Sequence, residues 1–374
     1  MTRTKKLIIT FSVMVTAIVA LILVLTLPER QWAESVNKEM EEKVTVTVRA
    51  VGDNLIHSPV WKSCKTDDGY NFDSVYENIS PHIKDADIAA VNQETVFVDE
   101  SWGYSGYPSF GVPKEVGESL IGAGFNVITH ATNHSYDRGL RGITYTMDFW
   151  KNYAGVIVLG VNDNPEKQQQ IDVFKKGDLS IAMLNFTDSL NGYTLPEDKP
   201  YLVNRLSMGE IEKNLLSRAE QTADITIVFV HFGTEYTHKP TEKQKEMVEF
   251  LCSNGADIII GTHPHVVQPY TKHTAENGNE AVVFYSLGNF VSNQGGIEKV
   301  LCAMADIKIT KENGVVSVES YKMHPVVTHC SDGKYSAYML DDYTDDLALR
   351  HTRAKGITVE KLKALYEKIL SVEI

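Results

Sequence analysis

Side chains that can bind a metal ion follow five predicted strands, each at the point where the strand ends. They are Asp53 and His57 after residues 44–51, Glu94 after 87–92, Asn133 and His134 after 125–129, His231 at the end of 225–231, and His263 and His265 after 257–261. Ligands of α/β folds bind in the crevice at the carboxyl ends of the strands, so we expect these side chains to converge. Carboxylate, amide and imidazole groups without thiolate suit Mn, Fe or Zn better than Ca or Mg.

The strength of this signal differs between positions, because several of them have a structural alternative. Asp53 follows a glycine and also fits a turn, and Asn133 also fits the cap of a following helix. His231 ends an apolar strand, where a buried imidazole needs a polar partner. The segment His263-Pro-His265 is the strongest single indication, because a turn stiffened by proline holds two imidazoles in position to bind metal.

Other polar residues nearby are candidates for supporting roles. Those that could orient the imidazoles or bind substrate are Asn92, Asp137, Glu235 and Gln268. A surface or core position is the alternative for His57. His130 precedes His134 by one helical turn, but a loop is expected there, and we interpret it as a core or supporting residue. We find no recognisable Ser-His-Asp or Cys-His arrangement and no glycine-rich phosphate loop.

The elements that must position these residues alternate between helices and near-continuous apolar strands, which predicts an α/β fold. Strands beginning near Ala303 and Val315 have no helix between them, and we expect them to form a second, partly antiparallel sheet. A last helix is predicted over about 358–370, with Thr358 as its N-cap. The acidic segment 341–346 is interpreted as a solvated linker before it.

The composition is that of a globular protein, with 43% hydrophobic and 23% charged residues among 374. The formal net charge of -13 argues against nucleic acid as a partner, because phosphate backbones recruit Lys and Arg. The four cysteines match no zinc-finger spacing. We interpret them as small buried hydrophobic residues, with one disulfide as the alternative.

The N-terminus predicts a membrane anchor. Residues 7–27 are uncharged and apolar, long enough to span ~30 Å of hydrocarbon, and basic residues precede them. The positive-inside rule then leaves the N-terminus cytoplasmic and the main domain extracellular, on a single-pass protein of the cell membrane. A cleaved signal peptide is the alternative, but the apolar run is long and no clear cleavage site follows. The predicted parts are the N-terminus and anchor (1–28), a stalk (29–43), the main domain (44–330) and a C-terminal linker and helix (331–374).

The combined motifs resemble those of one bacterial family. In chain order they are Gly52-Asp53-Asn-Leu-Ile-His57, Asn92-Gln-Glu94, Thr132-Asn133-His134-Ser-Tyr-Asp137-Arg-Gly139, Val230-His231-Phe-Gly233-Thr-Glu235-Tyr236, Gly261-Thr-His263-Pro-His265-Val-Val-Gln268 and Tyr285-Ser-Leu-Gly288-Asn289-Phe290. Over about residues 44–300 the chain resembles the bacterial capsule-synthesis CapA family, associated with poly-γ-glutamate capsules. That family is similar to the calcineurin-like metallophosphoesterases, which implies a metallophosphatase-like four-layer sandwich of two mixed β-sheets flanked by helices.

The resemblance also implies a role for each candidate residue around two divalent transition metals. The implied set is Asp53, His57 and His265 on one metal, Asn133, His231 and His263 on the other, Glu94 as the bridge, and His134 over the substrate as general acid or phosphate-binding group.

The sequence departs from the phosphoesterase pattern in four places. The first Asp and His are four residues apart rather than two, and the bridge is Glu rather than Asp. Thr132 replaces a glycine, and the segment Gly261-Thr-His-Pro-His is one residue longer than usual. These changes bear on the reaction more than on metal binding.

Two classes of function follow from this sequence. The first is a membrane-anchored CapA-family protein of capsule polymer biosynthesis or export, with a metal-dependent hydrolase site for a phosphoester or an anionic polymer. The second is a non-catalytic accessory subunit of a membrane polymer synthase or exporter, in which the metal site is structural.

Overall fold

The computed structural model describes residues 43–374. The anchor predicted over residues 7–27 and almost all of the predicted stalk lie outside this range. Among the described residues, no helix is both long and apolar enough to cross a membrane. Thr45–Thr310 and Val316–Ile374 form one compact unit, which carries all the candidate donor residues. Of the described residues, Lys43, Val44 and Lys311–Val315 fall outside this unit.

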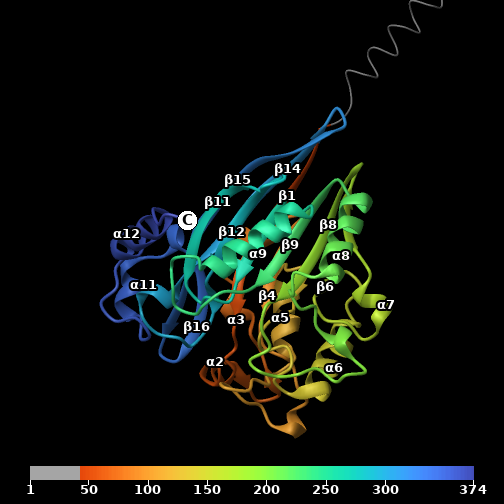
Figure 1. Ribbon diagram of the computed structural model, residues 1–374. Coiled ribbons are helices and arrows are strands. Elements are labelled where there is room, and N and C mark those ends of the chain that lie inside the picture. Colours follow the sequence, from red (N-terminus) through yellow and green to blue (C-terminus); the bar gives the residue numbers. More distant parts are fainter. Residues whose placement is uncertain (1–42) are drawn as a thin grey trace, which may run out of the picture. The chain divides into compact units, whose positions relative to one another are not determined.

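The first sheet has the strand order β16-β15-β14-β1-β4-β5-β6, and β13 also pairs with β1 (Figure 1). Its strands are β1 (Val44–Asn54), β4 (Ile88–Gln93), β5 (Val127–Thr129), β6 (Ile157–Leu159), β13 (Asn289–Val291), β14 (Leu301–Glu312), β15 (Val315–Ser331) and β16 (Lys334–Met339). The strands β1, β4, β5 and β6 are parallel, whereas β15 and β16 are antiparallel. The expectation that the late strands form a second sheet is therefore wrong: the chain leaves β13, which lies against β1, and returns to the same sheet.

The second sheet has the strand order β11-β12-β10-β9-β8-β7. Its strands are β7 (Asp172–Lys176), β8 (Leu179–Thr187), β9 (Ile225–His231), β10 (Ile258–Thr262), β11 (Val267–Thr274) and β12 (Glu280–Leu287). The four inner strands are parallel, and the two edge strands run antiparallel to them. The two mixed sheets that the resemblance implied are thus present, with a different assignment of the late strands.

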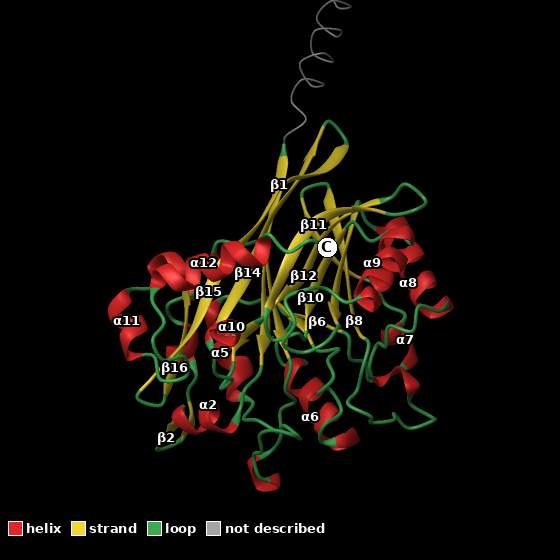
Figure 2. Ribbon diagram, turned by 60° about the vertical axis from the view of Figure 1, so that its left-hand side comes forward, coloured by secondary structure: helices red, strands yellow, loops and turns green. Residues whose placement is uncertain are grey.

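Helices cover the outer faces of the sheets, with α8 and α9 on one side of the strands and α2 and α5 on the other (Figure 2). The helices are α2 (Ser58–Ser63), α3 (Asp73–Tyr76), α4 (Ser80–Lys84), α5 (Glu115–Ala123), α6 (Gly139–Trp150), α7 (Pro165–Gln168), α8 (Glu210–Thr222), α9 (Glu242–Ser253), α10 (Ile297–Val300), α11 (Asp345–Arg350) and α12 (Val359–Leu370). Short 3-10 turns cover Glu100–Trp102, Pro200–Leu202 and Leu340–Asp342, and β2 (Lys65–Thr66) and β3 (Gly69–Tyr70) form a small hairpin.

Apolar burial holds each sheet to its helices. Ile128 of β5 packs in one core with Leu120 of α5, and Val228 of β9 packs in another with Leu251 of α9. Fully burying one such side chain stabilises the fold by about 1.5–3 kcal/mol. The alternate residues of the same strands, such as Ile227, are buried as well. Burial on both faces explains why the sequences of these strands are continuous apolar runs.

The C-terminal region is more structured than the sequence predicted. Thr358 caps α12 by accepting from the backbone N–H of Lys361, as expected. The acidic segment 341–346 instead lies in the 3-10 turn Leu340–Asp342 and at the start of α11, so its interpretation as a linker is wrong. Thr344 caps α11, and Asp345 and Asp346 occupy its first turn, where negative charge favours a helix. Asp345 and Asp346, which the sequence analysis assigned to a solvated linker, therefore stabilise the N-terminus of a helix.

All four cysteines are buried and free. Their interpretation as buried residues is confirmed, and the alternative of a disulfide is excluded in this structure.

Candidate metal centre

The candidate donors gather where the parallel strands of both sheets end. Asp53 of β1 lies in register with Asn92 of β4, and His231 of β9 lies in register with Thr262 of β10. The backbone N–H of His263, which follows β10, donates to the Asp53 carboxylate at 3.2 Å. This hydrogen bond joins the end of one sheet to the end of the other.

A glycine contact sets the path of β1 into the site. The Asp53 N–H donates to the Gly288 carbonyl at 2.9 Å. A Cβ on Gly52 would lie 1.8 Å from that same carbonyl oxygen, a distance that no side chain tolerates. The strand therefore passes directly against the turn before β13, and Asp53 follows at the end of this close approach.

Two buried groups of three donors share the carboxylate of Glu94. One group is Glu94, His231 and His263, and the other is Asp53, Glu94 and His265. Within each group, one ligand atom per residue lies within 4.8 Å of the others. His231 Nε2 and His265 Nε2 lie 3.7 and 3.8 Å from Glu94 Oε1. Glu94 thus has the position that a carboxylate bridging two cations would need.

The remaining short contacts orient the imidazoles. His231 Nε2 lies 3.0 Å from Asn133 Oδ1 and 3.1 Å from His263 Nδ1. The other nitrogen of His231, Nδ1, lies 3.0 Å from Thr262 Oγ1, which fixes the plane of the ring. His265 Nδ1 lies 2.9 Å from Asp53 Oδ2.

The electrostatics of this centre fit a divalent cation. Both carboxylate oxygens of Glu94 are buried without a hydrogen-bond partner, and burial, followed by the charge of Asp53, raises its pKa well above the usual range. Burial and the neighbouring His263 lower the pKa of His231, and burial and His265 lower the pKa of His263 to about 4. The imidazoles of His231 and His263 are therefore neutral, the form that binds metal. A cation would supply the partner that the buried carboxylate lacks.

His57 lies near the centre but in none of the donor groups of three found among the described residues. Its Nδ1 lies 3.0 Å from the Leu55 carbonyl and 3.3 Å from the backbone nitrogen of Asn293, and its ring packs edge-on against Phe110 at 5.2 Å. Burial lowers the pKa of His57 to about 4, so this imidazole is neutral as well. Its assignment to a metal stays a prediction.

His134 faces the centre from the loop after β5. Its Nε2 lies 3.9 Å from Glu94 Oε1, and its Nδ1 lies 2.7 Å from Asp137 Oδ2. That oxygen also accepts from the backbone N–H of Phe110 at 2.6 Å, which fixes the carboxylate. Asp137 is therefore placed to orient the imidazole of His134.

Sequence reasoning missed Asn191 in this part of the site. Its Oδ1 accepts from Asn133 Nδ2 at 3.2 Å, and its own Nδ2 lies 3.4 Å from His134 Nδ1. The only signal in the sequence was the pair Asn191-Gly192, which indicates a backbone turn but no catalytic or metal-binding role.

The other supporting candidates take different positions. Asn92 donates to Asp53 Oδ1 at 2.9 Å and lies inside the centre. Gln268 bonds instead to Gln244 of α9 and to the Thr237 carbonyl, so it supports a loop. Glu235 is exposed and forms a third donor group with His263 and His265. His130 accepts from the Trp150 indole at 2.9 Å and is a buried core residue, as interpreted.

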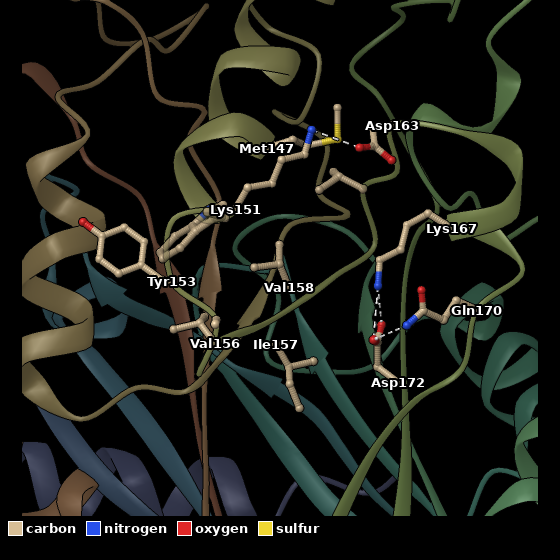
Figure 3. Close-up of a pocket in the computed structure, with 13 residues that line it drawn as sticks. Met147, Lys151, Tyr153, Val156, Ile157, Val158, Asp163, Lys167, Gln170 and Asp172 are labelled. Carbon is tan, nitrogen blue, oxygen red and sulfur yellow. Dashed lines mark hydrogen bonds and ion pairs between the residues drawn. The ribbon is translucent and has the colours of Figure 1, made fainter.

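A separate cavity of about 520 Å³ lies beside α6 and β6 (Figure 3). Apolar residues such as Val158 line it, and two ion pairs, Lys151–Asp163 at 3.0 Å and Lys167–Asp172 at 2.9 Å, lie at its polar side. Its lining includes none of the candidate donors, so the metal centre is a distinct site.

Comparison with known proteins identifies the family. The model of the bacterial capsule synthesis protein family PGA_cap matches residues 47–294, a range that includes every candidate donor. The chain belongs to this family. The resemblance seen in the sequence is therefore confirmed.

Two curated Bacillus relatives of this CapA-family chain have similar sequences. The capsule biosynthesis protein CapA of Bacillus anthracis is 30% identical over 305 residues, which cover 78% of this chain and 71% of the relative. The PGA biosynthesis protein CapA of Bacillus subtilis is 32% identical over 227 residues, covering 60% and 58%. The aligned part is thus less than two thirds of the second relative.

Solved structures similar to the CapA-family chain include two with phosphoesterase or nucleotidase names. The calcineurin-like phosphoesterase YfkN of Bacillus subtilis has a TM-score of 0.49 and 13% identity, covering 88% of this chain and 98% of that one. The NAD nucleotidase of Haemophilus influenzae has a TM-score of 0.44 and 15% identity, covering 87% and 67%.

Proposed function

We propose that this CapA-family chain acts in the biosynthesis or export of a capsule polymer of the poly-γ-glutamate type, through a dinuclear metal-dependent hydrolase site. The observation that carries the proposal is the Glu94 carboxylate, which is buried without a hydrogen-bond partner and shared by two donor groups. Such a group is costly unless a cation compensates it. Family membership and the names of the Bacillus relatives support the link to the capsule.

The proposed ligands divide between two cations. The full set is Asp53, His57 and His265 for one, Asn133, His231 and His263 for the other, and Glu94 between them. When bound, two such cations supply Lewis-acid polarisation and lower the pKa of a bound water. Asn133 and the neutral imidazoles add no negative charge, so the loaded site would attract an anionic substrate such as a phosphoester.

His134 is proposed to move the proton. Its Nδ1 lies against the Asp137 carboxylate, which accepts an N–H there and stabilises the protonated ring. The opposite nitrogen, Nε2, then carries a proton toward the interior of the site, where Glu94 lies. From that position it can donate to a leaving oxygen as general acid.

The proposed setting is the outer face of the cell membrane. The uncharged run at residues 7–27 and the basic residues before it support a single-pass anchor with the main domain outside. A membrane-embedded polymer synthase complex is the proposed partner. The acidic net charge of -13 disfavours nucleic acid.

A non-catalytic accessory role is the second candidate, because the relatives' names state biosynthesis and no hydrolysis. The test compares the full-length protein in detergent with the double variant His263→Ala/His265→Ala by elemental analysis and a phosphoester substrate screen. We expect close to two transition metals and measurable turnover in the wild type, and loss of most metal and all turnover in the variant. Unchanged metal content in the variant would refute the site, whereas metal without turnover in the wild type would favour the accessory role.

A further inference from the structure

A third donor group reaches the surface beside the buried centre. It consists of Glu235, His263 and His265, with one ligand atom from each within 4.8 Å of the others. The two histidines are buried, whereas Glu235 is exposed to solvent. This is the only one of the three donor groups found among residues 43–374 that includes an exposed member.

One backbone hydrogen bond and two contacts between a side chain and a backbone carbonyl hold the loop that carries Glu235 against the segment that follows His263. The N–H of Tyr236 donates to the Pro264 carbonyl at 2.8 Å, next to both histidines. Gln268 Nε2 donates to the Thr237 carbonyl at 2.9 Å, and His238 Nδ1 lies 2.8 Å from the Val267 carbonyl. Three contacts over residues 236–238 thus hold this loop against residues 264–268. The backbone next to Glu235 is therefore held beside the two histidines.

Both histidines of the surface group are also members of the buried groups. His263 Nδ1 lies 3.1 Å from His231 Nε2, and His265 Nδ1 lies 2.9 Å from Asp53 Oδ2. A neutral imidazole has one free lone pair, so each of these histidines can bind a cation at the surface or in the buried centre, one at a time. The donors form a continuous path from solvent at Glu235 to the buried carboxylate of Glu94.

We infer that Glu235 is a further cation ligand, which binds a divalent transition metal at the mouth of the centre together with His263 and His265. One carboxylate and two imidazoles are a common donor set for Zn and related metals. The inference rests on the proposed metal centre and adds to it a ligand outside the seven residues assigned above. Its role is to take the cation from solvent and pass it on to the buried donors.

The test measures Mn²⁺ binding to full-length protein stripped with a chelator, using the electron paramagnetic resonance signal of free Mn²⁺. Glu235→Gln keeps the size of the side chain and removes its charge. Glu298→Gln is the matched control, because Glu298 is also exposed and adjoins Lys299, whose ammonium lies 4.8 Å from the Tyr236 ring centre. Thermal melting of each variant checks that the fold is kept.

Glu235→Gln is expected to raise the dissociation constant of at least one bound Mn²⁺ by about tenfold or more. Glu298→Gln should leave all Mn²⁺ binding unchanged. Wild-type affinity in Glu235→Gln would overturn the inference while leaving the buried centre standing. Equal losses in both variants would also overturn it, because they would show a long-range charge effect. A wild type that binds no Mn²⁺ would defeat the proposed centre and this ligand together.

Discussion

Replacing Glu94 by glutamine should change the stability of the protein in opposite directions with and without metal. Both carboxylate oxygens of Glu94 are buried without a hydrogen-bond partner. A buried polar group in that state costs about 1–3 kcal/mol, and a charged one costs more. The amide of glutamine has no charge, and it can donate to the nearby Nε2 atom of His265, which lies 3.8 Å from Glu94 Oε1 and whose ring has its proton on Nδ1, against Asp53.

In metal-free protein, we therefore expect Glu94→Gln to raise the free energy of unfolding by about 1 kcal/mol or more. For a domain of this size, that corresponds to a melting temperature roughly 2 °C higher. With Mn²⁺ at a hundred times its dissociation constant, binding stabilises the wild type by about 2.7 kcal/mol. The variant lacks the shared carboxylate and loses most of that gain, so the wild type should then melt higher.

Differential scanning calorimetry on chelator-treated and Mn²⁺-loaded protein measures both differences. Glu298→Gln serves as the control, because an exposed carboxylate should show no crossover. A Glu94→Gln variant that melts below the wild type in both conditions would refute this expectation, since the buried carboxylate would then have a partner other than a cation. Equal stabilisation of both proteins by Mn²⁺ would also refute it.

Three further predictions concern catalysis, acid stability and topology. His134→Ala should keep the metals and the fold but lower phosphoester turnover by about 10²–10⁴-fold, and turnover equal to the wild type would contradict its role as general acid. Burial, followed by His351, lowers the pKa of His329 to about 4, so its contribution to stability is complete above about pH 6.5 and is lost as the pH falls toward 4. His329→Gln should therefore flatten the decline of the melting temperature on acidification, and an unchanged slope would exclude this group. If residues 7–27 anchor the chain, protease added outside intact cells should degrade the domain after residue 43, and protection of that domain in cells with an accessible envelope would refute the topology.

The sequence was most informative about site residues that lie at the end of a regular strand. The strand Ile225–His231 was predicted at its observed bounds, because a buried parallel strand is a continuous apolar run and His231 ends it. The polar residues that follow such strands converge for a topological reason, since parallel strands present their carboxyl ends at one edge. This reasoning placed Asp53, Glu94 and His265 together without any knowledge of their contacts.

What the sequence could not supply was long-range pairing and side-chain direction. β14 joins the sheet of β1 because distant chain segments pair, and no local pattern encodes that choice. Charge alone suggested a linker at Asp345, where Thr344 in fact starts a helix. His57 was assigned to a metal through the family resemblance. Its Nδ1 lies against the Leu55 carbonyl and the backbone of Asn293, so its orientation depends in part on a segment far along the chain.

The distance along the chain between the donors determines when the site comes into existence. Asp53 and His265 are in contact although 212 residues separate them, and His263 reaches Asp53 across 210. An extended or partly synthesised polypeptide therefore contains no such site, and the loops involved close only late in folding. Because metal binds a preformed site rather than the unfolded chain, a cation bound at this centre would be acquired in the compartment where the domain completes its folding. The supply of metals in that compartment, as much as the chemistry of the ligands, would then decide which ion occupies the centre.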